Sequence, residues 1–138
     1  MKDLQSFITD MVRIEEIESV QAFGHYPFQL MSEGSDDSLT LAVLDLGDVI
    51  PCYKIFAEHL AKGAKRIYMS IDFPAGGDLA EDFVAVFQYE NETFNVVALP
   101  YDAEGTQSPQ VTTEQSVHLS ELKTQFETIV KTFIKQEA

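Results

Sequence analysis

The first apolar residues of the chain recur at the spacing of a helix. Leu4, Phe7, Ile8 and Met11 fall on one face of a helical projection, with Asp3 before them as an acceptable N-cap. This pattern predicts a first helix that ends near residue 18.

A second pattern, in which polar and apolar residues alternate, predicts strands. Residues 38–47 are a clear example, because every second residue from Leu39 falls on the same face. Residues 20–32 alternate more loosely and contain Gly24 and Pro27. We therefore expect this segment to form an irregular or bulged strand at the edge of the sheet.

Residues 48–63 return to the helical period. Asp48 is a suitable N-cap, Pro51 is tolerated in the first turn, and Gly63 suits the left-handed conformation that ends a helix. The stripe that we expect to face the core consists of Val49, Tyr53, Phe56 and Leu60.

The second half of the chain predicts three strands and a final helix. The strands cover residues 67–73, 82–90 and 93–102. Both faces of the second of these strands are apolar, which is typical of a central strand, and the polar turn at residues 90–92 predicts a hairpin to the third. Residues 102–117 are polar and predict a long loop that could contain a short strand. The last helix follows, with Ser120 as its expected cap.

These elements follow the order α-ββ-α-βββ-α in a chain of 138 residues, a length that suits a single domain, residues 1–138. Because the hairpins imply antiparallel pairing, we predict an α+β fold: one antiparallel sheet of about five strands with helices packed against it. The element order resembles that of profilin-like folds, which include the roadblock-type dimerisation modules. That resemblance concerns topology alone and raises the expectation of a binding platform.

The charge of the chain narrows the range of its functions. Asp and Glu number 23 against nine Lys and Arg, which gives a net charge of −14, and no Lys or Arg occurs between Arg66 and Lys123. Such a surface repels phosphate groups and anionic lipids, so we expect no nucleic-acid partner and no membrane association. A basic protein is the partner that this charge favours.

The lone cysteine and the absence of any run of 18 apolar residues indicate a soluble protein of the reducing cytoplasm. That cysteine, Cys52, is seven residues from His59 on the same predicted helix, a separation of about 10.5 Å along the axis. A thiolate–imidazole pair is therefore not expected, and Asp48 opposes ionisation of the thiol. We interpret Cys52 as a small buried residue.

Four carboxylates surround the Pro-Ala-Gly-Gly sequence at residues 74–77. They belong to Asp72, Asp78, Glu81 and Asp82. Hard cations require several converging oxygen ligands, but the spacing of a calcium-binding EF-hand is absent. We therefore expect a structural loop, in which Gly76 and Gly77 allow a sharp reversal and Asp78 caps a short helical turn. No metal site and no cofactor are predicted.

No motif of a phosphate-binding loop or of a hydrolase is present, so the leading hypothesis is a non-enzymatic protein-binding module of the regulatory, adaptor or immunity type. Its carboxylates would meet a basic partner surface. The residues that we assign to this surface are Tyr68, Asp72, Asp78, Glu81, Asp82, Glu90, Glu92 and Asp102. Tyr68 and Asp72 would be available if the helices cover only one face of the sheet.

The alternative hypothesis is a metal-assisted or small-molecule-processing enzyme that uses Asp45, Asp72 and Asp78. It requires these carboxylates to converge in a pocket, whereas the binding hypothesis expects dispersed, solvated charges. A homodimer formed through the edge strand or the face of the sheet is compatible with either hypothesis.

Overall fold

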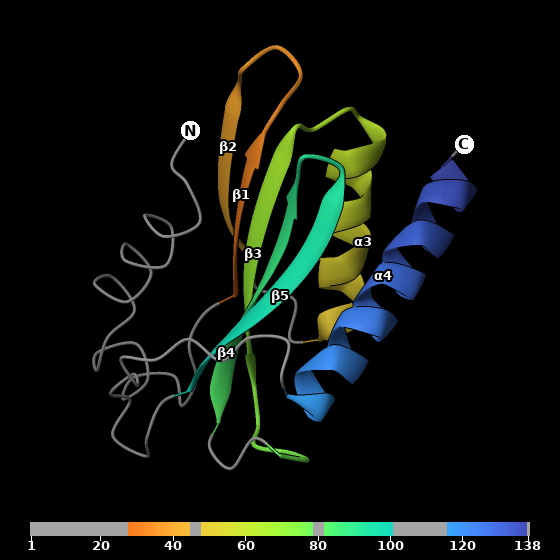
Figure 1. Cartoon of the computed structure of the whole chain (residues 1–138). Coiled ribbons are helices and arrows are strands. Elements are labelled where there is room, and N and C mark those ends of the chain that lie inside the picture. The colour runs from red at the N-terminus through yellow and green to blue at the C-terminus, as the bar shows by residue number, and fades with distance from the viewer. Residues whose placement is uncertain (1–27, 45–47, 79–81, 101–115, 138) are drawn as a thin grey trace.

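The structure is a computed structural model that describes residues 28–44, 48–78, 82–100 and 116–137. These ranges contain five strands and two helices, and we keep the labels that they have in Figure 1. The elements are β1 (Phe28–Glu33), β2 (Leu39–Leu44), α3 (Val49–Ala61), β3 (Arg66–Phe73), β4 (Phe83–Glu90), β5 (Thr93–Pro100) and α4 (Val117–Glu137). The predicted α+β class is confirmed, while the predicted first helix lies outside the described residues. None of the described helices is both long enough and apolar enough to span a membrane.

The strands form one antiparallel sheet in the order β2-β1-β3-β4-β5. Since β1 pairs with both β2 and β3, it is an interior strand, and the prediction of an edge strand is wrong for residues 28–32; residues 20–27 lie outside the described residues. The reason is that Gly24 and Pro27 precede the paired segment, which itself contains neither residue type. The prediction that β4 is central is confirmed, because β4 pairs with β3 and β5.

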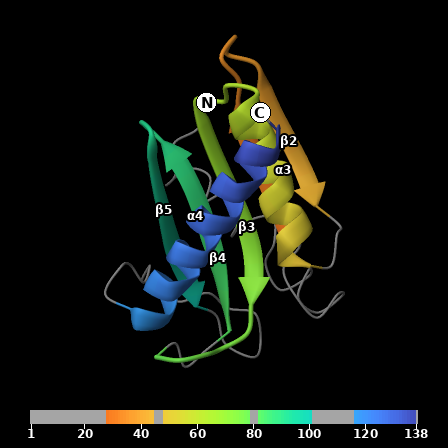
Figure 2. The ribbon, with the colours of Figure 1, turned by 90° about the vertical axis from the view of Figure 1, so that its right-hand side faces the viewer.

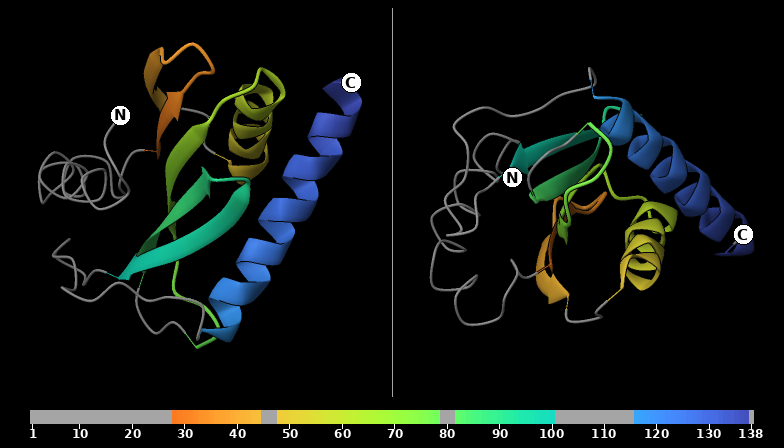
Figure 3. Two further views of the ribbon diagram at one scale, coloured as in Figure 1. Left: turned by 45° about the horizontal axis from the view of Figure 1, so that its top comes forward. Right: turned by 90° about the horizontal axis from the view of Figure 1, so that it is seen from below.

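The chain changes its place in the sheet between β2 and β3. Both strands are antiparallel to β1, which lies between them, so β2 and β3 run parallel to each other. Parallel strands need a crossover connection, and α3 provides it. Figures 2 and 3 show that α3 and α4 both lie on the same face of the sheet.

The core lies between this face and the two helices, where aromatic rings are concentrated. Phe126 of α4 is fully buried, and its ring centroid lies 4.5 Å from that of Phe87, 4.9 Å from Phe56, 5.2 Å from Tyr53 and 5.8 Å from Phe94. These four rings belong to α3, β4 and β5. A single side chain of α4 thus contacts the second helix and two strands of the sheet.

The opposite face of the sheet also has an apolar centre. Cross-strand pairing places Ser70, Val86 and Val97 in one row and Val84 and Leu99 in the next, all of them buried. We call this surface, which α3 and α4 do not cover, the second face. Ser70 is the polar residue of these rows, and its buried hydroxyl has no hydrogen-bond partner among the described residues.

The hairpin between β4 and β5 has a two-residue turn, as the sequence predicts. Glu90 pairs with Thr93, and the two central residues, Asn91 and Glu92, both have positive φ values, 53° and 62°. Positive φ at both positions defines the type I′ turn, whose twist matches that of the flanking strands. Asn tolerates a positive φ, whereas a residue such as Glu is strained in this conformation.

This strain predicts that Glu92→Gly stabilises the protein. Glycine removes the clash of the side chain at positive φ but costs conformational entropy in the unfolded chain, so we expect a net gain of about 0.5–1 kcal/mol in the free energy of unfolding. Urea titrations of both proteins measure the gain. The control is Glu92→Ala, which removes the same charge and keeps Cβ; an equal gain in this variant would show that charge, and not the backbone, is the cause.

Candidate functional site

The loop that follows β3 holds the start of α4. The two carboxylate oxygens of Asp78 accept hydrogen bonds from Ser116 Oγ at 2.7 Å, from the Val117 amide at 2.8 Å and from the His118 amide at 3.1 Å. Amides of the first turn of a helix lack partners within the helix, and a carboxylate there satisfies them and favours the helix dipole. Asp78 is therefore a structural residue, but it caps a helix about forty residues away along the chain and not a local turn.

The first residue of this capping arrangement is Ser116. Its hydroxyl oxygen accepts a hydrogen bond from the Leu119 amide at 3.1 Å while it donates to Asp78. This is the geometry of an N-cap. The predicted cap at Ser120 is wrong, because α4 begins one turn earlier, at Val117. Two serines four residues apart offer the same sequence signal, and only the position of Asp78 selects between them.

The glycine pair of the loop allows α4 to come close. A Cβ atom at Gly76 would lie 3.0 Å from His118 Cε1, and one at Gly77 would lie 2.9 Å from His118 Cβ. Gly77 also has a positive φ of 56°. On its other side the His118 ring meets Phe83 edge-on, with 6.1 Å between the centroids. Gly76 and Gly77 thus make room for a helix residue between the loop and β4.

The remaining carboxylates of this loop do not converge with Asp78 on an ion. Asp82 accepts a hydrogen bond from the Ala75 amide at 2.9 Å and so closes the loop, while Asp72 is half-buried on the second face, opposite Val84. Within the described residues, no three His, Cys, Asp or Glu side chains gather as a metal site requires. Asp45, which the enzymatic hypothesis also uses, lies outside these residues.

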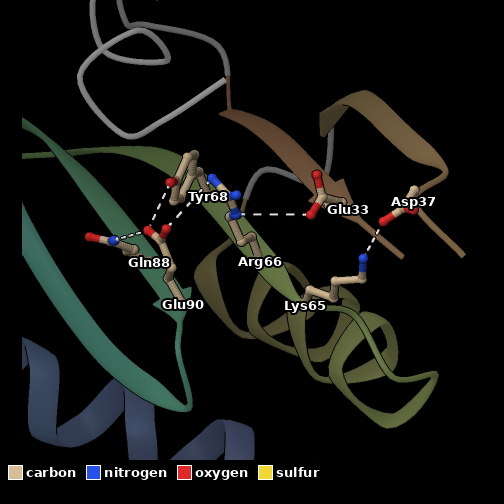
Figure 4. A network of polar contacts seen from close by, with 7 residues as sticks. All are labelled: Glu33, Asp37, Lys65, Arg66, Tyr68, Gln88 and Glu90. Carbon is tan, nitrogen blue, oxygen red and sulfur yellow. Dashed lines mark hydrogen bonds and ion pairs between the residues drawn. The ribbon is translucent and has the colours of Figure 1, made fainter. Parts of the chain in front are cut away.

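A second group of charged residues lies at the other end of the sheet, and Figure 4 shows it. Arg66 stands between two carboxylates on neighbouring strands: its Nε is 3.9 Å from Glu33 Oε1 and its Nη1 is 3.6 Å from Glu90 Oε1. Strand pairing aligns these three residues in one row. Glu90 also accepts hydrogen bonds from Tyr68 Oη at 3.0 Å and from Gln88 Nε2 at 2.9 Å. Lys65 pairs with Asp37 beside this row.

Tyr68 belongs to this network and is fully buried. It lies on the second face, as expected, but the inference that this position makes it available to a partner is wrong. Burial, together with the hydrogen bond to Glu90, raises the pKa of Tyr68 to about 12, so its hydroxyl remains protonated and acts as a donor near neutral pH. The network is therefore a set of satisfied cross-strand contacts that connects β1, β3 and β4.

The proposed partner-binding residues fall into two separate groups. Asp72, Asp78 and Asp82 lie at one end of the sheet, while Glu90 and Glu92 lie at the other. Asp72 lies six positions along β3 from Arg66, the residue that pairs with Glu90, which is a distance of about 20 Å along an extended strand. Glu81 and Asp102 lie outside the described residues. The carboxylates are thus dispersed, and no single cluster contains them.

Cys52 is fully buried, and its thiol donates a hydrogen bond to the Asp48 carbonyl oxygen at 3.2 Å. Burial, and next to it the charge of Asp48, raises the pKa of the thiol to about 11. The interpretation of Cys52 as a small buried residue is confirmed. Asp48 is also the predicted cap of α3, since its carboxylate accepts from the Val49 amide at 2.7 Å.

Two exposed apolar side chains on β2 were not predicted from the sequence. Leu39 and Leu41 are 51% and 64% exposed, although β2 has the alternation of a half-buried strand. Alternation predicts which residues share a face, but it does not show whether anything covers that face. A signal was present, because this edge strand contains no charged residue.

Comparisons with known protein families, with characterised proteins and with solved structures find no significant match. The function must therefore be inferred from the described residues. These residues include the buried thiol of Cys52, the protonated hydroxyl of Tyr68 and carboxylates that cap helices and turns. They also include the β2 edge of the sheet, which carries exposed leucines and begins beside the acidic β1–β2 turn.

The hydrogen bonds to Asp78 predict a stability change that depends on pH. The Ser116 hydroxyl, and then the amides of His118 and Val117, lower the pKa of Asp78 below its usual 3.8. The stabilisation is therefore complete above that value and is lost as the pH falls through the lower pKa of the folded state. We expect Asp78→Asn to melt at a lower temperature than the wild type at about pH 7. We expect this difference in melting temperature to become smaller below about pH 4.

The control for this experiment is Glu92→Gln, which removes one carboxylate at the opposite end of the sheet from Asp78. Thermal melts of the three proteins, followed by far-UV circular dichroism across this pH range, provide the comparison. If the gap between Asp78→Asn and the wild type is equally large at both ends of the range, the carboxylate does not cap α4.

Proposed function

We propose that the protein is a non-enzymatic binding module whose carboxylate-rich surface meets a basic protein partner. The observation that carries the proposal is the uneven placement of the basic residues. Every lysine among the described residues lies on α3, on α4 or in the connection between α3 and β3. The strands contribute one cationic residue, Arg66, which is held between Glu33 and Glu90.

Exposed carboxylates occupy the turns that join the strands. Asp36 lies in the β1–β2 turn, Asp82 in the β3–β4 loop and Glu92 in the β4–β5 turn. With a net charge of −14 on the whole chain, these positions create negative potential around the sheet. Such a potential speeds the association of a basic partner and weakens as salt is added.

The enzymatic alternative receives less support from the same residues. Asp78 uses both of its carboxylate oxygens to hold α4, and Cys52 is buried with a raised pKa. The oxygens of Asp78 are occupied by these hydrogen bonds, and the buried thiol of Cys52 stays protonated near neutral pH, so neither group has the activated form that catalysis requires. We therefore propose no reaction for this protein.

The proposal also includes the cellular location and the complete topology. We place the module in the reducing cytoplasm, where a single unpaired cysteine is usual. We also include a first helix ahead of β1, which would complete the α-ββ-α-βββ-α order shared with profilin-like folds. A partner and a second copy of the chain are compatible with this arrangement.

The proposal predicts that neutralising the carboxylates of the strand turns abolishes capture of a basic partner. The variant carries Asp36→Asn, Asp82→Asn and Glu92→Gln. The tagged wild-type chain and this variant are incubated with extract of the native cell, and retained proteins are identified by mass spectrometry. The association rate of the purified partner with the wild type is then expected to fall about tenfold or more between about 50 mM and 300 mM salt.

The matched control neutralises three carboxylates on the helices, with Glu58→Gln, Glu121→Gln and Glu127→Gln, and is expected to retain the partner. Circular dichroism of both variants establishes that each is folded. The proposal is wrong if the partner binds both variants equally, if its association rate is the same at low and high salt, or if no basic protein is retained.

A further inference from the structure

Strand β2 forms one margin of the sheet, and among the described residues no strand pairs with its outer side. Figure 1 shows it at the side of the sheet away from β5. Leu39 and Leu41 are mostly exposed on this strand, whereas β5 at the opposite margin has buried residues from Val96 to Leu99. Exposed, uncharged edge strands are sites where another strand adds to a sheet, and soluble proteins usually protect them with charges, proline or bulges.

The main-chain groups of Leu39 and Leu41 point toward the open side of β2. The β1–β2 hairpin closes with a hydrogen bond from the Gly34 amide to the Ser38 carbonyl oxygen at 2.8 Å. Hydrogen-bonded and non-hydrogen-bonded pairs alternate along an antiparallel ladder. The paired Thr40 therefore bonds to β1, while Leu39 and Leu41 direct their amide and carbonyl groups outward. The same residues place their side chains on the second face.

Exposed acidic residues lie at one end of this uncharged strand. Asp36 and Asp37 precede it in the β1–β2 turn and are both exposed, and Asp37 pairs with Lys65. A segment that pairs along β2 would therefore have its centre beside apolar residues and one of its ends beside the carboxylate of Asp36.

We propose that an extended segment of the basic partner adds to the sheet as a sixth strand alongside β2. This inference rests on the proposed function and names the site and the class of ligand: a segment with alternating apolar residues in the middle and Lys or Arg at the end that lies beside the β1–β2 turn. Its main chain bonds to the outward groups of Leu39 and Leu41, which supply affinity, and its basic end selects it by charge.

A second copy of the chain fits this edge less well. Each copy carries a net charge of −14, and this charge opposes the association of two copies near neutral pH. The charge pattern therefore favours a basic segment over self-association.

The test uses a synthetic peptide, Lys-Lys-Val-Thr-Val-Thr-Val-Lys-Lys, and the full-length chain. Heteronuclear NMR spectra are recorded as the peptide is added, and we expect saturable shifts of the Leu39 and Leu41 amide signals. The peptide in which Glu replaces each Lys is expected to cause no such shifts, because it carries the same sign of charge as Asp36 and Asp37. Shifts confined to α3 and α4 would overturn the inference.

The decisive variant is Leu41→Pro, which removes an outward amide from the edge without removing a hydrogen bond to β1. We expect it to weaken peptide binding about tenfold or more. Its matched control is Leu41→Thr, which shortens the apolar side chain and keeps the amide, and which should bind more tightly than the proline variant. Circular dichroism establishes that both variants are folded.

The outcomes separate this inference from the proposed function. If the captured basic partner binds Leu41→Pro as tightly as the wild type, the edge is not the site, although the binding function stands. If the capture experiment retains no basic protein, the proposed function itself is wrong. If sedimentation shows that the chain alone is a dimer that Leu41→Pro dissociates, a second copy occupies the edge and the inference is overturned.

Discussion

The contact of Phe126 with four aromatic rings is the interaction on which the rest of this structure depends. The rings of Tyr53, Phe56, Phe87 and Phe94 surround it and belong to α3 and to strands β4 and β5. Large aromatic side chains contribute most of the apolar area in such a core, and their edge-to-face contacts add to it. With α4 packed at this point, the face of the sheet beneath α3 and α4 is buried from solvent.

The position of α4 determines what the acidic loop does. The first turn of α4 reaches the loop between β3 and β4, where Asp78 caps it and the two glycines make room for His118. A carboxylate cluster that resembles a metal site in the sequence is thereby used to hold a helix. The exposed acidic residues of the strand turns do not converge with Asp78, and the binding function that we propose rests on their dispersed arrangement.

Local sequence patterns predicted the described strands and helices, but they did not predict contacts between segments far apart in the sequence. Alternation located the strands, and the Asn91-Glu92 turn was recognisable because so short a polar connection between two apolar runs suits a hairpin. The same reasoning failed for β1, whose second neighbour, β3, arrives only after the α3 crossover. It also gave Asp78 a local role, because a bond between Asp78 and Ser116 leaves no signature in either segment alone.

The most direct test of this account is the free energy of unfolding of Phe126→Ala, measured by urea titration with far-UV circular dichroism. We expect a loss of about 3–5 kcal/mol in one cooperative transition, because the cavity would separate α4 from α3 and the sheet together. Phe133→Ala, at a half-buried position on the same helix, is the control and should lose less. A loss in Phe126→Ala no greater than in this control would contradict the central role of the ring contacts.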